Sequence, residues 1–203
     1  MRATRGRTFT ETGRRAQIVA AAVETIAEVG YQQASFAKIA KKAGLSSTGM
    51  ISYHFTGKED LVRAVAEDVV ATVTAFMRER IEAAVGRAAR LRAYVESNIE
   101  VVGAHPAHVR ALLSILAGER SGADTSVLTE RVGRLEAELR DGQRAGEFGD
   151  FDPAVMALAI TGAIDALVTS LCREPATDAS LTHSAKELAD LLLRAAGARG
   201  SAS

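Results

Sequence analysis

The sequence is short of the residues on which several protein classes depend. It has no tryptophan, three prolines and a single cysteine among 203 residues. Because Cys172 has no second cysteine in the chain to pair with, a disulfide scaffold is excluded, and we expect a cytoplasmic protein. No run of about 18 uncharged apolar residues occurs, so no membrane span is expected. The basic N-terminus lacks an apolar signal core, so we expect no export.

Strand signals are missing too, since β-branched residues seldom alternate with polar ones. Alanine and leucine are abundant and apolar residues make up 47% of the chain, which favours a globular, all-α fold. We expect an N-terminal arm and helix-turn-helix domain over residues 1–58, and a larger helical domain over 59–203. Helical spacing and breakers predict about nine helices, over residues 12–29, 36–43, 48–53, 57–82, 87–103, 107–119, 127–145, 153–172 and 181–196.

The segment SFAKIAKKAGLSSTGMISYHFTGK, Ser35 to Lys58, is the most informative part of the chain. Ser35 is a good N-cap for a short helix, and Gly44 is placed to end that helix in a left-handed turn. A second short helix follows, which buries Ile51 and exposes mostly small or polar side chains. Two such helices joined by a tight turn are what a helix-turn-helix needs to lie in a DNA major groove.

Caps are also predicted for the next two helices. Ser46 or Ser47 can cap the second short helix. Thr56 can cap the long helix after it, and Glu59, three residues further on, would complete a capping box.

The net charge of zero hides an asymmetry. Residues 1–60 hold 9 Lys and Arg against 5 Asp and Glu, so the remaining residues hold 16 against 20. A basic head on an acidic body suits a protein that touches phosphates with one end, although ordinary variation of surface charge gives the same balance. Arg2, Arg5 and Arg7 lie in a stretch that we expect to be a mobile arm. Either these arginines reach a DNA backbone, or the stretch is only a solvated tail.

The exposed side chains of the helix-turn-helix suit contact with DNA. The hydroxyl of Ser35 and the free N–H groups beside it can bind a phosphate, as well as cap the helix. Lys38 can meet the backbone or merely solvate the surface. Met50 can press on a thymine methyl, and Gly49 lets the backbone approach. The second short helix has no Arg, Asn or Gln, so readout would depend on apolar contact, water, the arm or DNA shape.

The first 62 or so residues resemble the DNA-binding domain of the TetR (tetracycline-repressor-like) family. The resemblance rests on RRAQIVAAAVETIAEVGYQQASF, the FAKIAKKAGLS turn, the YHF triplet and GKEDL at the start of the long helix. It implies that Tyr53, His54 and Lys58 contact the DNA backbone, whereas Phe55 is core. The chain departs from the family pattern by one extra residue in LSSTGMISYHF and by Ser52, where an aromatic is frequent. The full predicted DNA-binding set is Ser35, Lys38, Ser46, Ser47, Thr48, Gly49, Met50, Ser52, Tyr53, His54 and Lys58.

The resemblance also implies a homodimer on a double-stranded, palindromic operator. The helix 153–172 is apolar nearly all round and therefore must be covered on more than one side. With the last helix it would form a four-helix bundle across a two-fold axis, the alternative being a monomer with an unusually apolar core. The predicted interface residues are Ala159, Ala163, Ala166, Leu167, Ser170, Leu188, Leu191 and Leu192.

An effector site among the helices between 87 and 172 is implied as well. Asp165 stands out inside an apolar helix, where it can bind a ligand cation, pair with an arginine, or sit wet at the dimer edge. Only four aromatic residues lie beyond residue 60, so an aromatic cage is not expected and an aliphatic or small amphipathic effector is favoured. The candidate residues are Met77, Tyr94, Asn98, His105, His108, Leu112, Leu116, Asp165 and Thr169.

An enzyme is the first competing interpretation, and we reject it. Cys172 and His183 would be the imaginable pair, but they lack an activating helix N-terminus and a third member. The four histidines have no metal-ligand spacing, so neither a metal nor another cofactor is expected. The sequence therefore predicts a ligand-responsive transcriptional regulator, and we expect it to be a repressor. An activator and a constitutive DNA-binding protein without effector remain alternatives.

Overall fold

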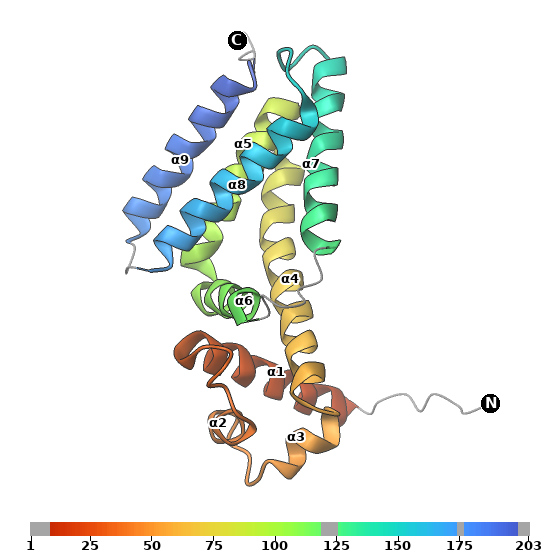
Figure 1. Cartoon of the computed structure of the whole chain (residues 1–203), viewed down its shortest axis with the longest axis vertical. Coiled ribbons are helices and arrows are strands. Elements are labelled where there is room, and N and C mark those ends of the chain that lie inside the picture. Colours follow the sequence, from red (N-terminus) through yellow and green to blue (C-terminus); the bar gives the residue numbers. More distant parts are fainter. Residues whose placement is uncertain (1–8, 119–125, 174–176, 199–203) are drawn as a thin grey trace, which may run out of the picture. The chain divides into compact units, whose positions relative to one another are not determined.

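The computed structural model describes residues 9–118, 126–173 and 177–198, and these form an all-α protein (Figure 1). Within those ranges there are nine helices and no strand, which confirms the predicted fold class. The helices are α1 Phe9–Val29, α2 Phe36–Lys42, α3 Gly49–His54, α4 Lys58–Ala83, α5 Arg87–Ala104, α6 Pro106–Gly118, α7 Ser126–Arg144, α8 Pro153–Leu171 and α9 Asp178–Ala195.

Backbone contacts divide the chain into two compact units. The first contains residues 1–72 and 107–120, and the second contains residues 73–106 and 121–203. The first unit thus combines α1 to α3 with the beginning of α4 and nearly all of α6. The predicted division at residue 58 concerns two functional domains and stays a prediction.

The core of the first unit is built from the apolar faces of its helices. Ile18 and Ile26 of α1 lie one above the other at helical spacing, and both are buried. Ile39 of α2, Ile51 of α3 and Phe55 are buried with them. Both short helices therefore contribute apolar residues to the core that α1 also enters. Gln17 adds a polar brace, since its side-chain amide donates a 2.7 Å hydrogen bond to the carbonyl of Ala43.

The ends of the short helices agree with the sequence only in part. Ser35 caps α2 and accepts a hydrogen bond from the backbone N–H of Lys38, and Gly44 takes the left-handed conformation with φ of 65°. The prediction that Ser46 or Ser47 caps α3 is wrong, because Thr48 occupies the cap position and makes no side-chain cap bond. The six-residue helix is instead held by its buried Ile51.

The predicted capping box before α4 also needs correction. The carboxylate of Asp60, rather than that of Glu59, accepts hydrogen bonds from Thr56, at 2.9 Å from its N–H and 3.3 Å from its hydroxyl. The helix begins at Lys58, two residues after Thr56, so Asp60 is the acidic residue within reach. The hydrogen bond from the Thr56 backbone is the main reason why the pKa of Asp60 lies below its ordinary value.

In the second unit α5 packs along α9, and α7 packs against α8 (Figure 1). Helix α5 also contacts α7 and α8, so it supplies side chains to the middle of this group. The buried apolar residues come from all four helices and include Leu91, Val95, Ile99, Leu135, Leu139, Ala157, Ile160, Ile164, Leu181, Ala185 and Ala189.

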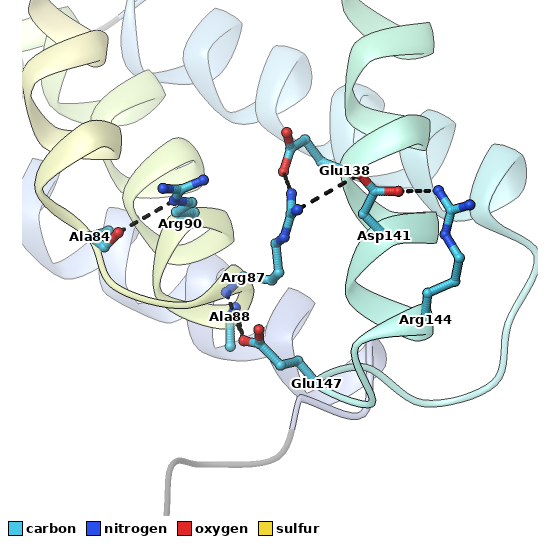
Figure 2. Close-up of polar contacts among 8 residues, drawn as sticks. All are labelled: Ala84, Arg87, Ala88, Arg90, Glu138, Asp141, Arg144 and Glu147. Carbon is cyan, nitrogen blue, oxygen red and sulfur yellow. Dashed lines mark hydrogen bonds and ion pairs between the residues drawn. The ribbon is translucent and has the colours of Figure 1, made fainter.

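The start of α5 is tied to the end of α7 by charged side chains (Figure 2). The carboxylate of Glu147, in the turn after α7, accepts hydrogen bonds of 2.6 Å and 3.3 Å from the backbone N–H groups of Arg87 and Ala88. This acceptor takes the place of a side-chain cap that Gly86 cannot offer. The guanidinium of Arg87 in turn binds Glu138 and Asp141 of α7.

The remaining helix ends follow their sequence signals. Pro106 stands at the first position of α6, just after the point where α5 was expected to end. Asp152 caps α8 by accepting from the N–H groups of Ala154 and Val155, with Pro153 at the first helical position, as predicted. The predicted arm with Arg2, Arg5 and Arg7 and most of the predicted loop 119–126 lie outside the described residues.

Helix α8 is the most apolar of the described helices. By length and composition alone it could cross a membrane, and α5 and α6 pass the same test only when taken together. Asp165 is the one charge that interrupts α8 in the sequence. The core helix of a soluble protein passes this test equally well, so the test by itself is weak evidence for a membrane span.

Candidate DNA-binding surface and effector residues

The turn and α3 present a nearly continuous exposed surface. Ser46, Ser47, Thr48, Gly49 and Met50 are all exposed, and so are Ser52 and Tyr53 further along the helix. No acidic side chain lies on α3. The surface therefore offers hydroxyls, one apolar side chain and close backbone approach, with no negative charge of its own to repel phosphates.

Two of the lysines of α2 are engaged with the protein itself. Lys38 donates a 3.1 Å hydrogen bond to the carbonyl of Gln33. The ammonium of Lys42 pairs with Glu28 and Glu24 of α1, and the hydrogen bond that it donates to Glu28 is the main reason why its pKa is raised. Because these carboxylates neutralise Lys42, it is a poorer candidate for a phosphate contact than its place in the lysine run indicates.

Tyr53 is the most exposed aromatic residue of the motif. Its side chain is 73% exposed, and its hydroxyl lies 3.3 Å from the carboxylate of Glu11. The rings of Tyr53 and His54 meet edge to face with centroids 5.1 Å apart. Because the side chain is so exposed, its ring and hydroxyl are accessible from solvent, as a contact with DNA requires.

Lys58 is held by Tyr31, a contact that sequence reasoning missed. Its ammonium donates a 2.9 Å hydrogen bond to the carbonyl of Tyr31 and stands 4.4 Å from the centre of the same ring. Tyr31 is itself fixed by α6, because its N–H donates a 2.8 Å hydrogen bond to the hydroxyl of Ser114. Nothing in the sequence spacing could reveal a contact between residues 83 positions apart.

The predicted effector residues fall in both units. Met77, Tyr94, Asn98, His105, Asp165 and Thr169 belong to the second unit, whereas His108, Leu112 and Leu116 belong to the first. In the first unit His108 lies 3.6 Å from the carboxylate of Asp68. In the second, the rings of His105 and Phe76 meet edge to face at 5.5 Å, and Asn98 donates a hydrogen bond to the carbonyl of Tyr94.

Asp165 pairs with an arginine, which is one of the three alternatives drawn from the sequence. Its carboxylate accepts a 2.9 Å hydrogen bond from Arg131 of α7, and Arg131 also donates a 3.0 Å hydrogen bond to the hydroxyl of Tyr94 on α5. The structure thus brings together two predicted residues, Tyr94 and Asp165, through Arg131, which no sequence signal singled out.

The predicted interface residues are mostly available on the surface. Ala159, Ala166, Ser170 and Leu191 are exposed, and Ala163, Leu167 and Leu188 are half-buried. Leu192 is only 6% exposed and packs inside its own unit, so it offers almost no surface to a partner. Two large apolar side chains of α8 outside the predicted set are exposed as well, namely Val155 at 63% and Leu158 at 60%.

Cys172 and His183 are the residues that a catalytic interpretation would use. Cys172 follows the last turn of α8, and His183 is exposed on α9. Among the residues described, no group of three or more His, Cys, Asp or Glu side chains could hold a metal ion.

Comparison with known proteins agrees with the geometry of the first unit. Residues 18–65 match the family model described as bacterial regulatory proteins, tetR family. The HTH-type transcriptional regulator BetI of Cronobacter sakazakii is 34% identical over 125 residues, which cover 61% of this chain and 58% of that relative. The chain thus spans less than two thirds of the curated relative's length.

Solved structures match over nearly the whole chain. The fatty acid degradation regulator FadR of Bacillus halodurans superposes with a TM-score of 0.74 and 27% identity, covering 88% of this chain and 97% of that one. FadR of Bacillus subtilis, in complex with stearoyl-CoA, gives 0.73 and 25% identity, covering 87% and 96%. The family model covers the helix-turn-helix, and these structures share the fold on both sides of it. This chain belongs to the tetR family of bacterial regulatory proteins.

Proposed function

We propose that this protein is a ligand-responsive transcriptional repressor, which binds a palindromic operator as a homodimer and releases it when a small molecule binds. The observation that carries the proposal is the exposed, acid-free surface of the turn and α3, held on a buried core in a chain of this family. An activator would use the same surface, and a constitutive DNA-binding protein would lack the effector.

The DNA-binding role rests on the α3 surface and its neighbours. Ser47, Thr48 and Met50 would face base edges, because they are exposed at the start of a short helix that can enter the major groove. Tyr53 and Lys58 would contact phosphates and fix the orientation of that helix. With no bidentate base-reading side chain on α3, DNA shape and water would share in the readout.

The dimer role rests on the exposed stripe of α8. Val155, Leu158, Ala159, Gly162 and Ala166 are exposed and follow helical spacing, so they lie on one face. A helix with mean hydropathy of 1.9 that leaves such a face in water is a surface for a second copy of the chain. Leu191 of α9, 54% exposed, would join it.

The effector role rests on the second unit. The Bacillus subtilis relative was solved with stearoyl-CoA, a ligand with a long apolar chain, and this favours an apolar or amphipathic effector here. Helix α4 contributes residues to both units, so a shift of α4 can carry the effect of binding to the DNA-binding end. Such a shift would move the two α3 helices of a dimer away from a spacing of about one DNA turn, ~34 Å.

The test is a selection of genomic DNA fragments bound by the purified full chain, repeated at two salt concentrations. The proposal expects a palindromic motif whose affinity falls steeply with salt. Weak binding without sequence preference at both salt concentrations would contradict it. A palindrome whose binding no small molecule weakens would favour the constitutive alternative.

A further inference from the structure

The contacts of Arg131 leave one nitrogen of its guanidinium unused. Its Nε donates to the hydroxyl of Tyr94 at 3.0 Å, and its Nη1 donates to the carboxylate of Asp165 at 2.9 Å. Its Nη2 is buried, and no group among the described residues accepts a hydrogen bond from it. A buried donor without an acceptor costs free energy. Either the protein carries this cost, or a bound molecule supplies the missing acceptor.

A second buried polar atom of this kind belongs to Thr161 of α8, which lies on the same helix face as Asp165. Thr161 is only 4% exposed, and its hydroxyl has no hydrogen-bond partner in the part of the chain that the structure describes. Thr161 precedes Asp165 by one helical turn, and side chains on a helix lean towards the turn before them. Residues one turn apart share a helix face, so Thr161 lies on the side of α8 from which the carboxylate of Asp165 reaches Arg131.

The charges around this place favour a neutral partner. Asp165 already balances the positive charge of Arg131, and its side chain is 49% exposed. A ligand carboxylate accepting from Nη2 would stand beside the carboxylate of Asp165 and be repelled. A carbonyl oxygen brings two lone pairs and no net charge, so it can accept from both Nη2 and the hydroxyl of Thr161.

The surroundings favour an apolar remainder for the same molecule. The neighbours of Thr161 on α8, Ile160 and Ile164, are buried, as are Val95 and Ile99 on the α5 helix that carries Tyr94. Tyr94 itself is already bonded to Arg131. The residues beside Thr161 on α8 and beside Tyr94 on α5 are thus aliphatic, and an aliphatic chain can contact side chains of this kind.

We infer that Arg131 and Thr161 recognise the carbonyl oxygen of a neutral, largely aliphatic effector such as an ester, lactone or amide. Tyr94 and Asp165 are positioning residues that hold the guanidinium by its other two sides. The inference rests on the proposed function, because it names the ligand class of the regulator's second unit. It replaces the simple idea that Asp165 attracts a cation.

The test measures binding of methyl esters of straight-chain acids, from four to ten carbons, to the full chain by calorimetry. The matching free carboxylates are measured in parallel. Thr161→Val removes the hydroxyl and keeps the shape, and Arg131→Met removes the guanidinium. Arg92→Met is the matched control, since Arg92 lies in the same unit and its guanidinium is bonded to Asp190 and Glu96.

At least one ester is expected to bind, with its carboxylate at least about tenfold weaker. Thr161→Val and Arg131→Met should each weaken the ester by about tenfold or more, as loss of a buried hydrogen bond does, and Arg92→Met should leave binding unchanged. No binding of any ester, tighter binding of the carboxylate, or unchanged ester binding by Thr161→Val would each overturn the inference.

A ligand-free measurement keeps the inference testable without any probe. Removing an unpaired buried hydroxyl should raise the thermal midpoint of free Thr161→Val by roughly 2–4 °C. A lowered midpoint would mean that the hydroxyl is satisfied in the free protein, and the inference would fail. Operator binding by the ligand-free wild type is scored separately, so failure of the ester site leaves a result on the proposed function intact.

Discussion

Lys58 is fastened to Tyr31 twice, by a 2.9 Å hydrogen bond to its carbonyl and by a 4.4 Å approach to its ring. An ammonium has three donors, so this arrangement aims the side chain and still leaves N–H groups for a phosphate. A lysine held in this way loses less freedom when DNA binds than a lysine in open solvent. Tyr31 thus prepares one of the proposed backbone contacts before any DNA arrives.

The first prediction concerns the salt dependence of DNA binding. If Lys58 contacts a phosphate, Lys58→Met should reduce the slope of log affinity against log salt by about 0.9. Lys42→Met is the matched control, because Lys42 is already neutralised by Glu28 and Glu24 and should change the slope much less. Equal changes of slope for the two variants would remove Lys58 from the DNA contacts.

The second prediction concerns Gly118, the last residue of α6. A methyl group added there would lie 2.4 Å from Cδ1 of Tyr31, so Gly118→Ala must displace that ring. We expect a loss of about 1–3 kcal/mol of stability and weaker DNA binding, because Lys58 moves with Tyr31.

Gly133→Ala is the control, since nothing lies within 4 Å of the added methyl on α7, and it should stabilise by about 0.5–1 kcal/mol. Thermal unfolding and operator titration would decide, and a Gly118→Ala protein that binds like the wild type would separate Tyr31 from DNA binding.

Local signals predicted the helices well but misplaced two caps, and contacts distant in the sequence were missed. Apolar spacing and caps such as Ser35 and Asp152 act within a few residues, so the sequence displays them directly. The cap of α4 went to Asp60 instead of Glu59 because the start of the helix was misjudged by a residue or two. Which acid caps a helix depends on that register.

The candidate site divides in the same way. The exposure of α3 follows from its small and polar residues, which are legible in the sequence. The pairing of Asp165 with Arg131 joins residues 34 positions apart on two helices, and only the packing of α7 against α8 selects that arginine. Asp165 was the signal that a partner was needed, but any of many arginines could have supplied it.

The third prediction separates two proposed contacts on α3. Tyr53→Phe should weaken binding to every sequence by about fivefold, because one hydrogen bond to a phosphate is lost. Met50→Ala should instead change the preference at one base-pair position by about 1 kcal/mol, since an apolar contact with a base is lost. A binding assay over a randomised operator measures both effects. Uniform weakening by Met50→Ala would place that side chain on the backbone.

The fourth prediction concerns the α8 stripe. Leu158→Glu puts a charge in the centre of the proposed interface and should loosen the dimer by about 100-fold or more. Val85→Glu is the matched control, because Val85 is 92% exposed and lies between α4 and α5. Sedimentation equilibrium gives both constants, and circular dichroism checks that each variant is folded. A Leu158→Glu protein that dimerises like the control would place the interface elsewhere.

The fifth prediction concerns acid and the start of α4. The hydrogen bond from the Thr56 backbone, assisted by the Thr56 hydroxyl and by nearby arginines, holds the pKa of Asp60 below its ordinary value. The unfolded carboxyl titrates at about 3.9, so the stability that this carboxylate contributes is present above that pH and is lost as pH falls through its lower folded pKa.

Asp60→Asn keeps an acceptor for Thr56 but cannot titrate. Its thermal midpoint should lie below that of the wild type at pH 6, and the gap should narrow as pH falls through the lowered folded pKa of Asp60. Glu59→Gln, one position earlier and exposed, is the matched control. A gap that stays constant from pH 6 to pH 2.5 would show that the charge of Asp60 does not stabilise the helix start.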